Sequence, residues 1–342
     1  MTYQASKLMS ATTIAVEDAT MPETIEAGWV RIKLAAASIC GTDMHYFRHF
    51  GNAGFALEHA ITLGHEACGW VEDANGADLK KGQLVALNPI INCGECAQCQ
   101  KGLVNLCTAK RFPGSALTKP HIDGFFREYF DFPAFCCRPV ADSVKPEHLT
   151  FAEPLACALH AVNTGHVKAG DKVLVTGCGP MGLLAIVGAA SKGAEVSCLD
   201  LRPNTVALGQ KVGATHGYVG GQDDLSGLNS QFDVVIEASG APVVFNQAMD
   251  FVRKRGIISM LSSMQSSTLP LNLQNIMLKE IQVLGSFQFN KEFEEAVQVI
   301  ESGKYDFDQM IAGKFGISDT AEAFDLALSG SKAGKVQLVG AA

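Results

Sequence analysis

Four cysteines lie close together in the first third of the chain. Cys93, Cys96 and Cys99 follow one another with two residues between each pair, and Cys107 comes after seven more. Thiolates at this spacing suit Zn²⁺, which takes four of them tetrahedrally in a closed site with no open position for a substrate. We therefore expect a structural zinc ion that holds the loop of residues 93–107 in one conformation. An iron–sulfur cluster, which also uses four cysteines, and a set of unligated core thiols are the alternatives.

A second group of metal-binding residues is spread more widely along the chain. Cys40 opens the segment Cys40-Gly41-Thr42-Asp43-Met44-His45, and Gly64-His65-Glu66 follows it. Cys40 and His65 offer a thiolate and an imidazole, and either Glu66 or Glu153 can add a carboxylate. Three protein ligands plus water form the usual catalytic zinc site. Each residue alone is more typical of a satisfied core position, so the prediction depends on the whole set.

A glycine-rich turn predicts a dinucleotide site. Gly177-Cys178-Gly179-Pro180-Met181-Gly182 has the pattern G-x-G-x-x-G, follows an apolar strand at 172–176 and opens a helix that runs to residue 192. The glycines permit a tight turn, and the helix N-terminus attracts a pyrophosphate. Asp200, at the end of the next strand, can accept hydrogen bonds from both ribose hydroxyls and repels a 2′-phosphate. We expect NAD, with Arg202 able to accommodate NADP; a glycine turn without a ligand is the alternative.

Two kinds of element must position these groups. Residues 29–34 alternate between apolar and polar, and turn signals break the first 150 residues at short intervals, which predicts a small β-rich domain or barrel. From residue 151, strands alternate with helices, which indicates βαβ units and a parallel sheet. The expected strands are 172–176, 195–199, 233–236, 256–261 and 281–287. A helix at 291–302 and a strand at 335–339 follow, in a segment that we expect to pack back on the first domain.

Composition narrows the class of protein further. The formal net charge of −8 disfavours a nucleic-acid partner, because an acidic surface repels phosphates. No apolar run approaches the ~20 residues needed to span a bilayer, and the first residues lack the features of a signal peptide, so we expect a cytoplasmic protein with no membrane partner. The other six cysteines are typical of small buried apolar side chains: Cys68, Cys136, Cys137, Cys157, Cys178 and Cys198.

Five motifs in order give the chain a family resemblance. They are C-G-T-D-x-H from Cys40, G-H-E from Gly64, the four-cysteine lobe, Ala152-Glu153-Pro154-Leu155 and the glycine-rich turn. The chain resembles the zinc-containing medium-chain alcohol dehydrogenases, of the polyol dehydrogenase branch, over essentially its whole length. The resemblance implies an α/β protein with two domains. A GroES-like β-rich catalytic domain would span 1–150 and 289–342, and a Rossmann domain with a doubly wound parallel sheet would span 151–288.

The same resemblance assigns roles to the metal-binding residues. It implies two zinc ions per chain, one structural and one catalytic. Cys40 and His65 would ligate the catalytic ion, while Glu66 and Glu153 would share the carboxylate role, one directly and one through water. Zinc favours a bound alkoxide over the alcohol, and the alkoxide then gives its hydride to the nicotinamide.

The resemblance also implies how neighbouring residues serve the substrate and the cofactor. Thr42 would hydrogen-bond the substrate hydroxyl, and His45 would pass its proton to solvent. Asp43 would orient the imidazole of His65 without binding the metal itself. Three further residues would belong to the cofactor site: Ser239, Ser286 and Phe287.

Three segments narrow the resemblance to the L-idonate 5-dehydrogenases, which interconvert L-idonate and 5-keto-D-gluconate. They are Arg111-Phe112-Pro113-Gly114-Ser115-Ala116, Pro120-His121-Ile122-Asp123-Gly124 and Gly285-Ser286-Phe287. Two positions depart from the pattern. Gln288 stands where we expect an arginine for a sugar-acid carboxylate, and Phe125 stands where a second glycine is usual. Three other residues could bind the carboxylate in place of this arginine: Arg111, His121 and Arg127. The alternative is that they are ordinary surface or loop residues.

The expected activity is therefore hydride transfer between NAD(P) and a secondary alcohol of a polyol or sugar acid, with L-idonate as the favoured substrate. Sorbitol and L-threonine are the alternatives within the enzyme class. A catalytically silent binding protein of the same fold is the alternative from another class. A zinc-free reductase would need neither ligand set, and the acidic balance disfavours a zinc-ribbon nucleic-acid binder. Because dimers and tetramers both occur in the resembling family, we expect a homo-oligomer.

Overall fold

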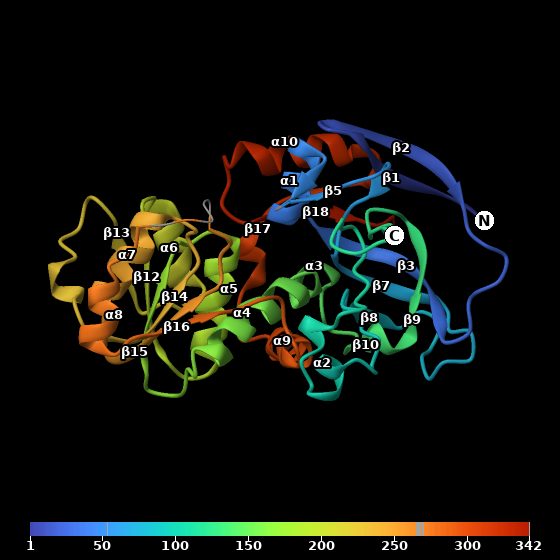
Figure 1. The fold of residues 1–342 in the computed structure, drawn as a ribbon. Helices are drawn as coiled ribbons and strands as arrows, with labels where there is room; N and C mark the ends of the chain where they lie inside the picture. The colour runs from blue at the N-terminus through green and yellow to red at the C-terminus, as the bar shows by residue number, and fades with distance from the viewer. Residues whose placement is uncertain (53, 265–267, 269, 342) are drawn as a thin grey trace. The chain divides into compact units, whose positions relative to one another are not determined.

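The chain folds into two compact units, which Figure 1 shows with their elements labelled. The computed structural model describes residues 1–52, 54–264, 268 and 270–341. Unit 1 consists of Met1–Glu153 and Ile311–Ala342, and unit 2 consists of Pro154–Met310. Over the described residues, unit 1 contains sheets of seven, three and two strands, and unit 2 contains one sheet of six strands.

Unit 1 is built mainly of strands. Its strands are β1 (Thr2–Ser10), β2 (Thr13–Thr20), β3 (Trp29–Ser38), β4 (Gly51–Asn52), β5 (Phe55–Ala56), β6 (Ile61–Thr62), β7 (Glu66–Asp73), β8 (Leu84–Leu87), β9 (Tyr129–Pro133), β10 (Cys137–Pro139), β17 (Ile311–Phe315) and β18 (Lys335–Val339). Its α-helices are α1 (Gly41–His49), α2 (Ala97–Gln100), α3 (Pro146–Leu149) and α10 (Thr320–Ser329). Short 3-10 helices lie at Val104–Leu106, Ala134–Cys136 and Ile317–Asp319.

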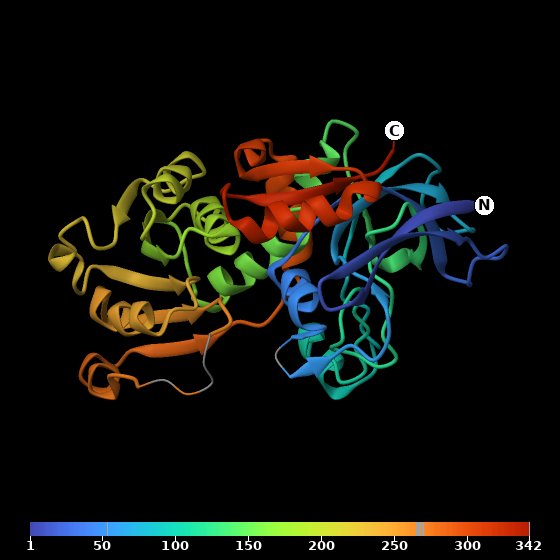
Figure 2. The same ribbon diagram turned by 90° about the horizontal axis from the view of Figure 1, so that it is seen from above.

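Strand β3 is the centre of unit 1. It belongs to a seven-stranded sheet of order β10-β8-β7-β3-β18-β17, in which β9 also pairs with β3. Strand β18 joins this sheet antiparallel to β3, with Gln337 opposite Ser38. The last strands of the chain therefore lie in the same sheet as β3, and Figure 2 shows β17 and β18 from above.

The alternation predicted for 29–34 follows from the burial of one face of β3. Val30, Ile32 and Leu34 are completely buried, as period-2 alternation requires. They join a core that includes four phenylalanines, two of them on the neighbouring strand β9: Phe125, Phe126, Phe130 and Phe132. Phe125 stacks within this cluster, with its ring centroid 5.0 Å from that of Phe130.

Unit 2 alternates strands with helices. Its strands are β11 (Lys172–Thr176), β12 (Glu195–Asp200), β13 (His216–Val219), β14 (Phe232–Glu237), β15 (Val252–Met260) and β16 (Gln282–Gly285). Its helices are α4 (Ala152–Thr164), which begins two residues before the boundary, α5 (Pro180–Ser191), α6 (Pro203–Lys211), α7 (Pro242–Phe251), α8 (Leu273–Lys279) and α9 (Glu292–Glu301). Short 3-10 helices lie at Ser226–Leu228 and Phe307–Met310.

The six strands of unit 2 form one parallel sheet of order β13-β12-β11-β14-β15-β16. The order reverses between β11 and β14, because the chain first adds strands on one side of β11 and then returns to the other side. Ligands of such doubly wound sheets bind beyond the carboxyl ends of the strands at this switch point. The fold therefore places the glycine-rich turn after β11 where a dinucleotide is expected.

The two units differ in one respect from the predicted domain division. Residues 289–310, predicted to belong with the first domain, fall in unit 2. The reason is helix α9, whose apolar face buries Phe293, Ala296 and Val297 and whose first residue, Glu292, is bound by His160 of α4 at 3.1 Å. The return to unit 1 begins at Ile311, the start of β17.

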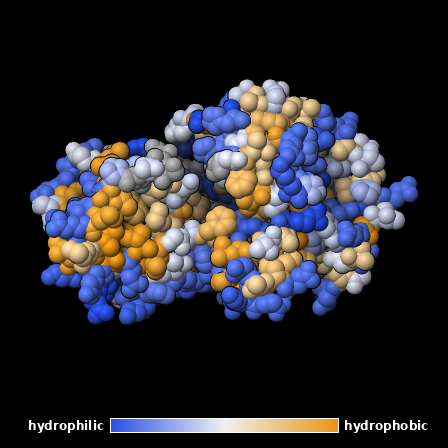
Figure 3. All heavy atoms as spheres, in the orientation of Figure 1, coloured by the Kyte–Doolittle hydropathy of each residue, from blue (hydrophilic) through white to orange (hydrophobic). Residues whose placement is uncertain are grey.

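Two surface properties complete the description. Within the described part of the chain, no helix combines the length and apolar character that crossing a bilayer requires. Exposed apolar side chains gather around α7 and α8 of unit 2 (Figure 3). They are Val243, Leu271, Leu273, Met277 and Leu278.

Candidate functional site

The residues predicted to bind a catalytic metal lie together in unit 1. Cys40 is the residue that precedes α1, and His65 and Glu66 lie at the start of β7. Because Ser38 of β3 pairs with Glu66 of β7, the chain brings the two segments side by side. One ligand atom each from Cys40, His65 and Glu66 lies within 4.8 Å of the others. A thiolate, an imidazole and a carboxylate this close fit one zinc ion, whose bonds to such atoms are about 2.0–2.3 Å long.

Asp43 ties the two metal-binding segments to each other. It is fully buried, and its carboxylate accepts hydrogen bonds from the amides of Cys40 at 2.9 Å and Gly64 at 3.2 Å. His65 Nδ1 lies 3.6 Å from Asp43 Oδ1, beyond hydrogen-bond distance. Asp43 therefore acts on His65 through its negative charge. It also fixes the position of His65, because it binds the amide of the preceding residue, Gly64.

The charges around His65 favour its protonated form. Burial lowers the pKa of His65, but the negative charges of Asp43, Cys40 and Glu153 raise it overall, well above its ordinary value. Its Nδ1 is buried and has no hydrogen-bond partner among the described residues. Since only the neutral imidazole binds a metal, a cation that binds His65 must displace a proton.

Lys335 is a residue of this site that sequence reasoning missed. It lies on β18 and its Nζ is 2.6 Å and 2.5 Å from the two carboxylate oxygens of Glu66. Ser38 Oγ also donates to Glu66, and both charged side chains are buried. Burial lowers the pKa of Lys335, but the negative charges of Glu66 and Cys40 raise it overall, so this lysine stays charged.

The three remaining residues predicted for the reaction lie on two helices. Thr42 and His45 belong to α1, where Thr42 is half-buried and His45 is exposed. Glu153 is buried in the first turn of α4, and its charge raises the pKa values of His65 and Lys335. Among the described residues, the compact set of metal-binding atoms contains Glu66 and not Glu153.

The four cysteines of the predicted structural site also converge. Their ligand atoms lie within 4.8 Å of one another. The Cys93 sulfur is 3.5 Å from that of Cys107 and 4.0 Å from that of Cys99. Thiolates bonded at about 2.3 Å to one tetrahedral zinc ion are roughly 3.8 Å apart. The cluster therefore fits a structural zinc ion.

Backbone amides around the cluster favour thiolates, which are the metal-binding form. Amide hydrogen bonds from Cys99 and Thr108 lower the pKa of Cys96 to about 5, and those from Cys96 and Glu95 lower the pKa of Cys93. Burial has the opposite effect on Cys107 and raises its pKa to about 11. By contrast, burial raises the pKa of Cys136 to about 12, in keeping with its predicted role as an inert core residue.

The glycine-rich turn has the geometry that a dinucleotide requires. Gly177 follows β11 and has a positive φ of 88°, which favours glycine. Gly179 precedes α5 and has no atom within 4 Å of where a side chain would begin, so a ligand can approach its backbone closely. A Cβ on Gly182 would lie 1.8 Å from the Gly177 oxygen. Gly182 is therefore needed for the packing of helix against turn.

Two acidic residues hold the loops around this turn. Asp200, at the end of β12, accepts hydrogen bonds from the amides of Cys178 at 2.7 Å and Arg202 at 3.0 Å. Burial raises the pKa of Asp200, but these amides lower it overall. Glu237, which sequence reasoning missed, is fully buried and accepts a hydrogen bond from the amide of Ser239 at 2.8 Å. Glu237 thereby fixes the loop after β14 against the glycine-rich turn.

The last two predicted cofactor residues follow β16. Ser286 donates its amide to Met260 at 3.0 Å, and its buried hydroxyl has no hydrogen-bond partner among the described residues. Phe287 is 49% exposed. An unpartnered hydroxyl and an exposed aromatic ring beyond the carboxyl end of a parallel strand fit a bound cofactor.

The two departures from the expected substrate pocket have different outcomes. Phe125 points into the core of unit 1, where it is 1% exposed and contacts Phe130 and Phe132. The glycine before it is required, because a Cβ on Gly124 would lie 2.3 Å from the Gly64 oxygen. Gln288 is half-buried with a positive φ of 52°.

Two of the three candidate substitutes for the missing arginine are engaged by neighbouring residues. Arg127 donates to the Asp123 carbonyl at 3.3 Å and lies over the Phe130 ring. His121 contacts the Thr118 carbonyl at 3.0 Å and accepts from the Glu58 amide at 3.3 Å. The side chain of Arg111 is exposed, and its backbone pairs with Ile91 beside the cysteine lobe.

Comparison with known proteins agrees with this geometry. Residues 26–142 match the family model of the alcohol dehydrogenase GroES-like domain, and residues 180–302 match that of the zinc-binding dehydrogenases. The chain is 33% identical to the L-idonate 5-dehydrogenase (NAD(P)(+)) of Escherichia coli K12, over 90% of this chain and 91% of that one. It is 28% identical to the sorbitol dehydrogenase of Bacillus subtilis 168, over 95% and 93% of the two chains.

Solved structures show the same relation in three dimensions. The crystal structure of the Escherichia coli L-idonate 5-dehydrogenase matches with a TM-score of 0.95 at 31% identity, over 99% of this chain and 98% of that one. A zinc-binding dehydrogenase of Sinorhizobium meliloti 1021, bound to NADP, matches with a TM-score of 0.87 at 29% identity, over 99% of both chains. With its four-cysteine lobe, buried metal-binding cluster and glycine-rich turn, the chain belongs to the zinc-binding alcohol dehydrogenase family of oxidoreductases.

Proposed function

We propose that this protein transfers hydride between a secondary hydroxyl of a sugar acid or polyol and NAD(P), and that L-idonate is its substrate, with 5-keto-D-gluconate as the product. The observation that carries the proposal is the cluster of the half-buried Cys40 with the buried His65 and Glu66, in a chain that is 33% identical to an L-idonate 5-dehydrogenase over 90% of its length. Cys40, His65 and Glu66 would hold the catalytic zinc ion, with Glu153 near it. Zinc bound there would lower the pKa of a coordinated hydroxyl.

Helix α1 supplies the route for the hydroxyl proton. Thr42 is half-buried and accepts a hydrogen bond from the substrate hydroxyl. His45 is three residues further on, so it lies on the same side of the helix, and it is exposed. The proton can therefore pass from the buried hydroxyl by way of Thr42 to His45 and then to solvent.

Unit 2 supplies the hydride acceptor. The amides at the start of α5 bind the pyrophosphate, and Asp200 accepts hydrogen bonds from the adenosine ribose. The negative charge of Asp200 favours NAD over NADP, while the exposed Arg202, whose Nε is 3.5 Å from Asp200 Oδ1, can turn toward a 2′-phosphate. We expect a higher kcat/KM with NAD⁺ than with NADP⁺ in the wild type. Asp200→Ser should shift the ratio of the two kcat/KM values toward NADP⁺.

The proposal is tested by initial rates of NAD⁺ reduction with L-idonate, sorbitol and L-threonine at matched concentrations. A clear preference for L-idonate supports it and means that a group other than an arginine at position 288 binds the carboxylate. A preference for sorbitol moves the substrate to a neutral polyol, the alternative that the Bacillus subtilis relative supports. His65→Ala should abolish turnover and retain NAD⁺ binding, whereas His216→Ala, on an exposed side chain of unit 2, should change neither.

The zinc content separates the enzyme from a catalytically silent protein of the same fold. Two zinc ions per chain support the proposal, whereas one ion with NAD⁺ still bound favours the silent alternative. The exposed apolar side chains around α7 and α8 support the expected self-association, since patches of this kind mark interfaces. The homo-oligomeric state and the cytoplasmic location stay predictions, which light scattering and cell fractionation would check.

A further inference from the structure

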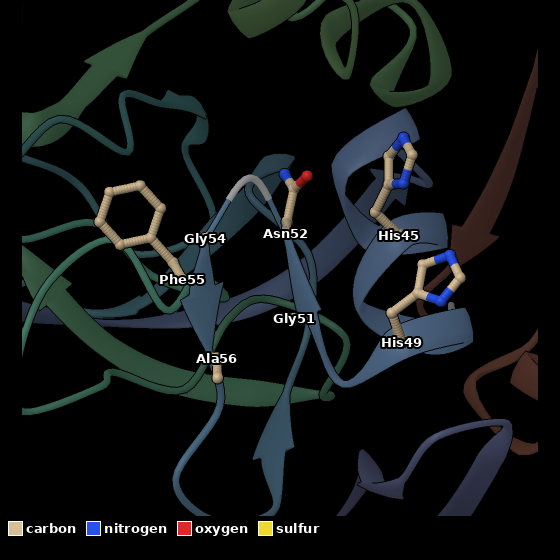
Figure 4. A pocket seen from close by; sticks show the side chains of 7 residues that line it. All are labelled: His45, His49, Gly51, Asn52, Gly54, Phe55 and Ala56. Carbon is tan, nitrogen blue, oxygen red and sulfur yellow. The ribbon is translucent and has the colours of Figure 1, made fainter. Parts of the chain in front are cut away.

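Helix α1 carries a second histidine that the proposed reaction does not use. His45 and His49 are four residues apart, so both lie on one face of the helix, and both are exposed. They line a pocket of about 380 Å³ whose other wall is the hairpin of β4 and β5. Figure 4 shows the two imidazoles one above the other on α1, with the hairpin beside the helix.

The spacing of the two rings suits a shared metal ion. Their centroids are 6.3 Å apart and the ring planes are inclined by 31°. A first-row transition metal bonded to two imidazoles at about 2.1 Å holds their centroids roughly 4.5–6 Å apart. Small side-chain rotations close this difference, because both rings are exposed. Two histidines at this spacing on one helix face are a known zinc-binding pattern.

The rest of the pocket favours a transition metal over other ligands. Its other lining residues are Gly51, Asn52, Gly54, Phe55 and Ala56, so among the described lining residues no side chain carries a permanent charge. Such a wall neither repels a cation, as a lysine would, nor attracts Ca²⁺ or Mg²⁺, which need several carboxylates. Asn52 lies on the hairpin (Figure 4), lines the same pocket as His45 and His49, and offers an amide oxygen as a third donor. Imidazoles with a neutral oxygen suit Cu²⁺, Ni²⁺ and Zn²⁺.

We propose that His45 and His49 form a third metal-binding site for these divalent cations, separate from the catalytic and structural zinc sites, and that a cation bound there inhibits turnover. Binding itself rests on the α1 geometry alone. Inhibition rests on the proposed function, in which His45 carries the substrate proton to solvent. An imidazole nitrogen that is bonded to a metal cannot accept that proton, so occupation of the site removes His45 from the route.

The binding step is tested with Ni²⁺ as the probe, by calorimetric titration of the full chain loaded with zinc. The wild type should bind one Ni²⁺ per chain while its zinc content, measured afterwards by mass spectrometry, is unchanged. His49→Gln should weaken this binding about tenfold or more, since it removes one of two imidazole ligands. His216→Gln is the matched control and should bind Ni²⁺ like the wild type. Equal Ni²⁺ affinity in the His49→Gln variant and the wild type would overturn the proposed site.

The inhibition step is tested separately, by initial rates with and without Ni²⁺. His49→Gln should keep the kcat/KM of the wild type in metal-free buffer and should need about ten times more Ni²⁺ for half-inhibition, in proportion to its weaker binding. If Ni²⁺ inhibits both proteins equally, the inhibitory role is wrong. If the chain turns over none of the substrates tested, the proposed function fails with the inhibitory role, whereas the calorimetric result still decides whether the metal site exists.

Discussion

At the scale of single residues, the metal-binding residues of unit 1 depend on a positive charge from a residue outside the ligand set, Lys335. Glu66 is buried with both carboxylate oxygens bound by Lys335, and Ser38 donates to one of them. A buried carboxylate without a cation is strongly disfavoured. Lys335 is therefore a positioning residue: its ammonium holds the Glu66 carboxylate beside Cys40 and His65.

Replacing Lys335 by Met should therefore destabilise unit 1 strongly. Removal of one partner from a buried ion pair costs about 3–5 kcal/mol, whereas an exposed pair contributes about 0–1 kcal/mol. Lys314→Met is the matched control, because Lys314 makes a partly exposed pair with Glu147 at 2.7 Å in the same sheet. The measurement is the urea concentration at the midpoint of unfolding, together with the zinc content of the folded protein. Similar losses in the two variants would contradict the role of Lys335.

At the scale of elements, the turn between β11 and α5 uses its glycines for two different purposes. Gly182→Ala places a Cβ against the Gly177 oxygen and must deform the turn, whereas Gly179→Ala meets no atom within 4 Å in the protein itself. We therefore expect Gly182→Ala to lower the melting temperature of unit 2. Gly179→Ala should keep the melting temperature and weaken NAD⁺ binding, because its methyl group lies where the pyrophosphate approaches. Calorimetry and NAD⁺ titration check both expectations, and normal NAD⁺ binding by Gly179→Ala would place the pyrophosphate elsewhere.

The junction of α4 and α9 should make the stability of unit 2 depend on pH. Burial raises the pKa of Glu292, but hydrogen bonds from His160, the Asn290 amide and Asn163 outweigh it, and the pKa falls to about 2 from an ordinary 4.5. A lowered pKa means stability that is complete above pH 4.5 and is lost as the pH falls toward 2. At 1.36 kcal/mol per pKa unit, this contribution is at most about 3 kcal/mol.

Glu292→Gln should accordingly lower the free energy of unfolding at pH 7. The difference in this free energy between the variant and the wild type should shrink as the pH falls from 4.5 to 2. Urea unfolding at several pH values measures this difference. Glu294→Gln, on an exposed position of the same helix, is the control and should show little effect at any pH. A difference that stays constant down to pH 2 would mean that the Glu292 charge does not contribute.

Local sequence patterns predicted the individual sites, and long-range packing accounts for what they missed. The glycine-rich turn is recognised from its own spacing, whereas Cys40 and His65 were predicted as ligands from the whole set of motifs and the family resemblance. Lys335 lies 269 residues from Glu66 and reaches it only because β18 pairs with β3. The predicted domain division differs from the two compact units over 289–310 for the same reason. Helical periodicity identified α9, but no local signal indicates that it packs on α4.

At the scale of the whole molecule, the two kinds of ligand belong to different units. All the proposed zinc ligands lie in unit 1, and the glycine-rich turn with Asp200 lies in unit 2. Zinc removal should therefore loosen unit 1, because four thiolates released from a structural ion no longer pin their loop. NAD⁺ should stabilise unit 2 by about 2.7 kcal/mol at a hundred times its Kd.

Hydrogen exchange followed by mass spectrometry separates the two effects segment by segment. After zinc is removed with a chelator, exchange should rise in 93–107 and 40–66, and Cys96→Ser should reproduce the rise in 93–107 alone. Added NAD⁺ should slow exchange in 177–182 and around Asp200 and Ser239, whether or not zinc is present. Protection of the cysteine lobe by NAD⁺, with no change in the glycine-rich turn, would contradict the assignment of the cofactor to unit 2. The expected pattern would establish that each unit binds its own ligand, so that zinc content and cofactor affinity can be changed independently in this chain.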